Sequence, residues 1–177
     1  MQFSRNSTVL GSLTVDGRPE QVAAARGFVR RLVSRLGAID SEAATLLTSE
    51  LVTNAIQHTR SGREGGTVTV VVLAVSEGVL VEVIDAGSPG VPVVKADLYA
   101  QQGHGLFLVQ RLASQWGYLR HPGGTTVWFH LPAVRGTATS DVPPKNGQAL
   151  AVSWTAAMTP AQIAARSSSS VMYGGIV

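Results

Sequence analysis

The feature that most limits how this chain can fold is a pair of apolar, β-branched runs separated by a short turn. Residues 67–75 read TVTVVVLAV, residues 79–84 read VLVEVI, and Glu77-Gly78 stands between them. Runs of this composition and length, bounded by turn residues, are typical of strands. The short connection predicts that the two strands pair as an antiparallel hairpin, so the fold is expected to contain a sheet built on it.

Further strands and helices are predicted on both sides of this hairpin. The remaining strands are expected at residues 8–15, 117–120 and 125–131, and helices are expected at residues 19–36, 41–58 and 106–116. Gly37 is expected to end the first helix, and Asp40 or Ser41 to cap the second. Because strands and helices do not alternate strictly, we expect an α/β two-layer sandwich. Its sheet should be mixed but mostly antiparallel, with helices on one face.

The composition predicts one folded domain followed by a tail. Of the 177 residues, 45% are hydrophobic and only 14% are charged, which is ample for a core. Residues 136–177 are rich in Ala, Ser, Thr, Gly and Pro and carry only three charged side chains. We therefore expect a domain at residues 1–135 and a largely disordered, low-complexity tail at 136–177, with docking of the tail to a partner as the alternative.

Several classes of protein are excluded or disfavoured by what the sequence lacks. There is no cysteine, which excludes disulfides, zinc–thiolate sites and thiol nucleophiles. The first residues contain no apolar signal-peptide core, and no uncharged apolar run approaches the roughly 18 residues that span a bilayer. We therefore expect a cytoplasmic protein that does not enter a membrane.

The positive charge does not predict nucleic-acid binding. The formal net charge is only +3, and the arginines of the first predicted helix are not interleaved with aromatic residues. A solvated helix face explains them best, and a contact of Arg26 and Arg30 with an acidic protein partner is the alternative. No direct binding to nucleic acid is expected.

Common catalytic motifs are also missing. The sequence has no Walker-type phosphate loop, no H-E-x-x-H metal site and no G-x-S-x-G nucleophile elbow. Its four histidines show no metal-ligand spacing. Any catalytic chemistry must come from other residues.

A row of polar residues in the second predicted helix is the first candidate. In the segment SELVTNAIQHT, residues 49–59, Glu50, Asn54 and His58 recur at steps of four. On a helical wheel this row lies at the edge of the apolar arc and not opposite to it, so partial burial is expected. A network of hydrogen bonds that only stabilises the fold is the alternative, and His58 fits either role.

The chemistry of this row suits a phosphorylated ligand. An amide oxygen is a neutral, hard ligand, and Mg²⁺ commonly takes only one or two protein ligands and fills its octahedron with phosphates and water. Asn54 is therefore a candidate ligand of a nucleotide-bound Mg²⁺. Glu50, one turn away, is a candidate general base that accepts a proton from an attacking hydroxyl.

A second candidate lies at the end of the predicted hairpin. By the period of two, Val81, Val83 and Asp85 share one face of the strand, so a carboxylate ends an otherwise apolar row. An ionised carboxylate only accepts hydrogen bonds, which suits the exocyclic amine of adenine. Gly87 would let a flat base lie against the backbone. Asp-x-Gly is also common as a simple turn.

Two further stretches complete the set. Gly103, His104 and Gly105 precede a predicted helix, where free N–H groups and small residues can bind phosphate, although G-x-G also serves as a flexible helix entry. Thr125 is the hydroxyl that joins the apolar face of the last predicted strand, so it could line a base pocket or serve only as a strand former.

The order of these stretches resembles one superfamily. Glu-x-x-x-Asn-Ala-x-x-His, strand-Asp-x-Gly, Gly-x-Gly-Leu and Gly-Thr follow one another like the N, G1, G2 and G3 boxes of the GHKL (Bergerat-fold) ATPases. The short form is similar to the anti-sigma-factor serine kinases of the RsbW/SpoIIAB type. The resemblance covers about residues 8–134 and implies the Bergerat fold.

The resemblance also implies roles. ATP and Mg²⁺ are the implied cofactors, with Asn54 coordinating the metal and Glu50 acting as base. Asp85 would bind the adenine amine, with Gly87 and Thr125 in the same pocket. The Gly103–Gly105 stretch would form the lid over the phosphates.

Members of this family dimerise, bind a sigma factor, and phosphorylate a serine on a competing anti-anti-sigma protein of the STAS fold. They tend to place an arginine in or just before the lid, but residues 99–105 read YAQQGHG and hold no fixed cation. Either protonated His104 or a distant arginine such as Arg111 takes its place, or phosphotransfer is weak. Two other functions therefore stay open: a non-catalytic, nucleotide-dependent regulator that sequesters a partner, and a detached histidine-kinase-like catalytic domain.

Overall fold

A computed structural model describes residues 7–89 and 105–134, and every structural statement below concerns these residues. The strands are β1 (Thr8–Asp16), β2 (Thr67–Val75), β3 (Gly78–Asp85), β4 (Gln115–His121) and β5 (Gly124–Pro132). The α-helices are α1 (Val22–Val33), α2 (Ser41–His58) and α3 (Gly105–Leu112), and short 3-10 turns cover Pro19–Gln21, Ser34–Leu36 and Arg60–Gly62. The strands and helices predicted for this part of the chain are thus all present.

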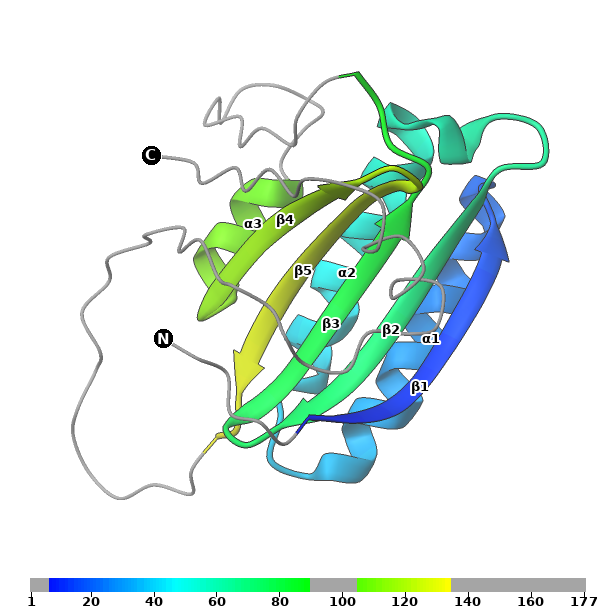
Figure 1. Ribbon diagram of the computed structural model, residues 1–177. Helices are drawn as coiled ribbons and strands as arrows, with labels where there is room; N and C mark the ends of the chain where they lie inside the picture. Colours follow the sequence, from blue (N-terminus) through cyan, green and yellow to red (C-terminus); the bar gives the residue numbers. More distant parts are fainter. Residues whose placement is uncertain (1–6, 90–104, 135–177) are drawn as a thin grey trace.

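The five strands form one open sheet in the order β1-β2-β3-β5-β4 (Figure 1). All four pairings are antiparallel, and the hairpin of β2 and β3 lies in the middle of the sheet, as its apolar sequence requires. β3 pairs with β5 and not with the strand that follows it in the chain. The end of β3 is thereby placed beside the start of β5.

The three helices cover one face of the sheet, as predicted (Figure 1). Their apolar side chains and the alternate residues of the strands form the main core, whose largest fully buried members include Leu47, Val29 and Phe129. Burial of this apolar area is the main source of the fold's stability. The two-layer α/β sandwich is therefore confirmed.

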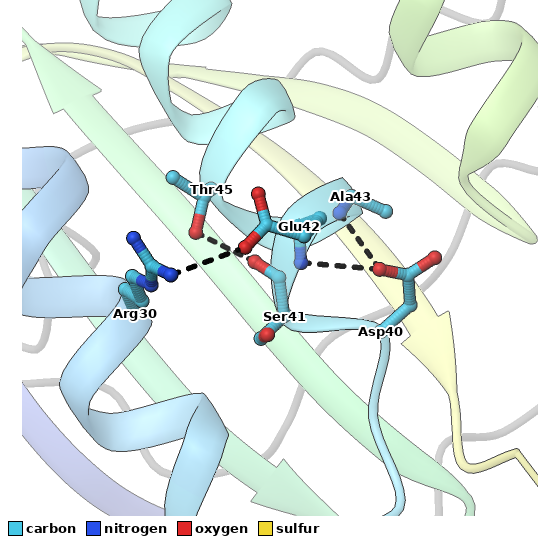
Figure 2. A network of polar contacts seen from close by, with 6 residues as sticks. All are labelled: Arg30, Asp40, Ser41, Glu42, Ala43 and Thr45. Carbon is cyan, nitrogen blue, oxygen red and sulfur yellow. Dashed lines mark hydrogen bonds and ion pairs between the residues drawn. The ribbon is translucent and has the colours of Figure 1, made fainter.

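The start of α2 is stabilised by the predicted cap. The Asp40 carboxylate accepts hydrogen bonds from the backbone N–H groups of Glu42 and Ala43, at 3.1 and 2.9 Å, which satisfies two of the donors that a helix start leaves unpaired (Figure 2). Glu42 also forms an ion pair with Arg30 of α1, at 3.4 Å, between two exposed side chains. The cap fixes the position of α2, which carries Glu50 and Asn54.

The prediction for the third helix was too long. α3 ends at Leu112, and Trp116, which we expected on the helix, is buried in β4. Ser114 redirects the chain, because its backbone N–H donates to the carbonyl of His130 and its hydroxyl lies 2.6 Å from the Nδ1 atom of His130. Pairing with β5 outweighs the helical spacing of the apolar residues.

Several predictions fall outside the described residues. They concern the tail at 136–177 and the segment that holds Gly103 and His104. No helix of the described part is long and apolar enough to cross a membrane.

Candidate functional site

The candidate site lies where β3 ends beside β5. Asp85 is the last residue of β3 and pairs with Thr125 in the register of the two strands. Both are buried, with 6% and 5% of their surface exposed, at the end of a row that contains Val81 and Val83. The alternation of the strand therefore carries the carboxylate onto the helix-covered face, as the sequence predicted.

A tight turn holds the Asp85 carboxylate in place. The backbone N–H of Gly87 donates to its Oδ1 atom at 2.6 Å, and Gly87 has a φ of 73°, which favours glycine. A Cβ on Gly87 would lie 3.1 Å from the Cα of Gly124, the residue before Thr125. The turn after β3 and the start of β5 thus approach each other closely at a point where both residues lack side chains.

Burial changes the acidity of this carboxyl. Loss of solvent raises the pKa of Asp85 from its ordinary value of 3.8 to about 6. The hydrogen bond from Gly87, the Thr59 hydroxyl, the nearby charge of Arg60 and the backbone of Thr125 each lower the pKa, but by less than burial raises it. With a pKa of about 6, Asp85 is mostly ionised at neutral pH, and a further N–H donor from a ligand would stabilise its charged form.

A pocket of about 280 Å³ opens next to this turn. It is lined by Arg60, Gly87, Ser88, Pro89, Arg120, His121, Gly124 and Thr125. Glycine backbone on two sides and the Thr125 hydroxyl leave a slot of the kind that suits a flat, polar-edged ring. Gly87 and Thr125 therefore line one pocket, and Asp85, which does not line it, is joined to both by the hydrogen bond from Gly87 and by the pairing with Thr125.

Two arginines that we did not predict hold the wall of this pocket. Arg60 donates from Nη2 to the carbonyl of Ala86 at 2.6 Å, and Arg120 donates from Nη2 to the carbonyl of Ser88. The buried hydroxyl of Ser61 also accepts from the N–H of Ala86, at 2.8 Å. The loop after β3 is therefore fixed by side chains from two other elements, and both guanidinium groups lie at the pocket.

The sequence contains a signal for one of these two arginines, Arg120. A two-residue turn at Pro122-Gly123 sets Arg120 directly opposite Thr125, as the register of β4 and β5 has it. Arg60, in contrast, follows α2 by two residues, and nothing in the sequence indicates that it meets the loop after β3. Its role depends on a tertiary contact.

Two of the three residues in the polar row of α2 have the partial burial that the helical wheel predicted, and the prediction is wrong for the third, His58. Glu50 and Asn54 are half-buried, while Leu47, Leu51 and Ala55 around them are buried. His58, at the end of the helix, is exposed. Glu50 and Asn54 do not line the pocket beside Asp85, so within the described part of the chain the row and the pocket are two separate groups of residues.

The glycines before α3 are only partly described. Gly105 is the first residue of α3, whereas Gly103 and His104 lie outside the described residues. Arg111, which we considered as a substitute for the missing lid arginine, packs its guanidinium over the ring of Phe107 at 5.8 Å. That cation–π contact lies within α3 itself.

A metal ion at this site would depend on few protein ligands. In residues 7–89 and 105–134, no three His, Cys, Asp or Glu side chains gather in a group that could hold one. Mg²⁺ needs only one or two protein ligands when phosphates supply the rest, and the half-buried amide of Asn54 fits that role.

Comparison with known proteins places this geometry in context. Residues 15–131 match the family described as the histidine kinase-like ATPase domain. A solved structure of the RsbU and RsbW domains of Rv1364c from Mycobacterium tuberculosis is similar with 22% sequence identity and a TM-score of 0.48, over 73% of this chain and 35% of that one. The chain thus spans about a third of the length of that protein. No curated protein matches it.

Proposed function

Because the chain belongs to the histidine kinase-like ATPase domain family, we propose that it binds ATP with Mg²⁺ and transfers the terminal phosphate to a serine of a STAS-fold partner protein. In doing so it would act as a regulator of the anti-sigma-factor type, releasing and recapturing a sigma factor as the partner is phosphorylated. The observation that carries the proposal is the buried Asp85, which pairs with Thr125 and accepts a hydrogen bond from Gly87, two residues that line the 280 Å³ pocket.

Recognition of the base follows from that carboxylate. Asp85 can accept a hydrogen bond from the exocyclic amine of adenine, and a charged acceptor in a buried position makes such a bond strong. The Thr125 hydroxyl can donate or accept at a ring nitrogen or through a water molecule, and the pocket of about 280 Å³ that Gly87, Gly124 and Thr125 line would hold the ring. Arg60 and Arg120 keep the loop that forms this wall in position.

Phosphotransfer is assigned to the row on α2. Asn54 would hold Mg²⁺ through its amide oxygen, and Mg²⁺ supplies neutralisation of the phosphate charge when it is bound. Glu50, one helical turn before Asn54, accepts the proton of the serine hydroxyl as that oxygen attacks the terminal phosphorus. The bond from phosphorus to the bridging oxygen then breaks, ADP leaves, and phosphoserine is formed.

The partners are proposed from the resemblance of the four ordered motifs to the anti-sigma serine kinases. They are a sigma factor and a STAS-fold anti-anti-sigma protein, with the chain itself as a homodimer. A cytoplasmic location agrees with such partners. Direct contact with nucleic acid is no part of this function.

The kinase proposal is tested by incubating the full chain with Mg-ATP and candidate STAS-fold proteins from the same organism, followed by mass spectrometry for phosphoserine. Glu50→Gln should abolish phosphoserine and leave the Kd for ATP within about twofold, since Glu50 does not line the base pocket. Glu42→Gln is the matched control, because it makes the same change on an exposed residue of the same helix. Phosphoserine that forms equally in the Glu50→Gln variant would remove Glu50 from its role.

A second function is favoured by one observation. Arg111 packs over Phe107 within α3, so the arginine that the sequence offered as a substitute for the missing lid cation already has a partner. A chain that binds ATP without transferring phosphate would sequester its partner in a nucleotide-dependent manner. ATP binding without any phosphoserine, under conditions where the STAS-fold protein binds, would favour this function over the kinase.

A further inference from the structure

The face of the sheet that the helices do not cover is nevertheless apolar and buried. Val71, Leu73, Leu80 and Trp128 form a second core cluster there, separate from the main core, with Val75 and Ile84 packed against it. The strand registers place them on one face, because Val71, Glu82 and Trp128 form one cross-strand row and Leu73, Leu80 and His130 form the next. We refer to this surface as the helix-free face.

The four cluster residues are too well buried for an open surface. Their exposed fractions are 1% for Val71, 2% for Leu73, 0% for Leu80 and 5% for Trp128. Trp128 lies across the backbone of Gly117, where a Cβ would be 2.8 Å from the indole. All three described α-helices lie on the opposite face (Figure 1). Something other than these helices therefore covers the helix-free face.

We propose that the C-terminal segment, residues 136–177, is the cover, and that it docks on the helix-free face of its own domain. The first argument is where the segment begins. The chain leaves β5 at Pro132, which pairs with Gly78, and the N–H of Ala133 donates to the carbonyl of Glu77 at 2.9 Å. The next N–H, that of Val134, donates to the carbonyl of Ala38, which precedes α2. The segment thus starts at the end of the sheet where Leu73 and Leu80 lie, between the β2–β3 turn and the chain before α2.

The second argument is composition. Residues 146–165 contain no Asp, Glu, Lys or Arg and include Leu150, Val152, Trp154, Met158 and Ile163. Such a stretch can lie on an apolar sheet face without burying an unpaired charge. The segment is also long enough, since an extended chain advances about 3.3 Å per residue and the strands of the face hold seven to nine residues.

The other stretches outside the described residues fit less well. Residues 90–104 leave the sheet at the far end of β3, next to the nucleotide pocket, and residues 1–6 are too few to cover a cluster drawn from three strands. A second copy of the chain is the remaining competitor. The two can be distinguished by dilution. A face covered by a second copy becomes exposed when the copies separate, whereas a face covered by the chain's own C-terminal segment stays covered.

The test uses the full chain and the dye ANS, which fluoresces on exposed apolar surface. Leu150→Asp/Met158→Asp places two charges in the uncharged stretch. Thr139→Asp/Ser168→Asp places the same charges in the segment but outside that stretch. The proposal predicts a several-fold rise in ANS fluorescence for the first pair only, with unchanged far-UV circular dichroism and unchanged mass by light scattering.

A second readout follows Trp128 directly. Trp116→Phe/Trp154→Phe leaves Trp128 as the only one of the three tryptophans. In that background, iodide quenching of Trp128 should be weak and should rise several-fold when Leu150→Asp/Met158→Asp is added.

Three results would overturn the proposal. They are equal quenching and ANS binding with and without the Asp pair, strong ANS binding by the unmodified chain, and exposure of the face when the unmodified chain is diluted and its mass halves. The last result would assign the face to a second copy.

Discussion

The substitution Asp85→Asn should make the protein more stable at neutral pH while removing the group on which base recognition depends. Asn has nearly the same shape, and its Oδ1 atom can still accept the hydrogen bond from the N–H of Gly87, which is 2.6 Å away in the parent protein. The buried negative charge is lost, and the new NH2 group can no longer accept the hydrogen bonds that Thr59 and the backbone of Thr125 give to the carboxylate; only the loss of the charge gives a difference that varies with pH. The part of the difference that varies with pH therefore isolates the cost of placing that charge in the site.

The size of the effect follows from the pKa of Asp85. A rise from 3.8 in the unfolded chain to about 6 in the folded protein corresponds to about 3 kcal/mol, at about 1.4 kcal/mol per pH unit. Well below pH 3.8 the carboxyl is protonated in both states, and parent and variant differ little. As the pH rises towards 6, only the unfolded chain has released its proton, so the parent loses stability relative to the variant. Above about pH 6 the difference stays constant.

The assay is urea denaturation of both proteins at pH 4.5 and pH 8. The difference in the free energy of unfolding between Asp85→Asn and the parent should grow by about 2 kcal/mol over this interval, because part of the effect is already present at pH 4.5. Asp16→Asn, at an exposed position of β1, is the control for the same chemical change. A difference that does not change with pH, or a variant less stable than the parent at pH 8, would refute the reasoning.

Three further predictions concern the cap, the strand approach and the metal. Asp40→Ala removes the acceptor of two N–H groups at the start of α2 and should lower the free energy of unfolding by about 1 kcal/mol in urea. Gly124→Ala sets a Cβ 1.7 Å from the carbonyl oxygen of Asp85, so the free energy of unfolding should fall by on the order of 3 kcal/mol, measured by thermal shift. The same variant should lose ATP binding, measured by titration. Asn54→Ala should weaken ATP binding in Mg²⁺ but not in EDTA; equal weakening in both would exclude Asn54 as the metal ligand.

The elements of this fold were predictable where local chemistry decided them. Asp40 caps α2 because a short carboxylate at that position satisfies helix N–H groups in almost any context. Gly37 ends the preceding helical segment with a φ of 65°, which glycine adopts without strain. The hairpin of β2 and β3 follows from its composition alone. In each case the deciding contacts lie within a few residues in the chain.

Prediction failed where partners distant in the chain decide the structure. Trp116 fits a helical spacing as well as a strand, and only the pairing of β4 with β5 selects the strand. The same holds for the site. The positions of Asp85 and Thr125 were predicted one by one, but their pairing requires that β5 lie next to β3. Arg60 entered the pocket through a contact with Ala86 that no local pattern indicates.

The helix-free face shows a further limit. The alternation of β5 correctly placed Trp128 and His130 on the face opposite Phe129, but a face opposite the core is ordinarily expected to be solvated. Both side chains are instead buried. Periodicity identifies which residues share a face, whereas burial depends on what else in the molecule packs there.

The central claim is that the Asp85 carboxylate accepts a hydrogen bond from the exocyclic amine of adenine. The direct test is calorimetric titration of the full chain at pH 8 with Mg-ATP and with Mg-ITP, which carries an oxygen in place of that amine. Loss of a hydrogen bond to a buried charged group costs about 1.5–3 kcal/mol, so ATP should bind at least about tenfold more tightly than ITP. This preference should disappear in Asp85→Asn. Equal affinities of the unmodified chain for the two nucleotides would contradict the claim.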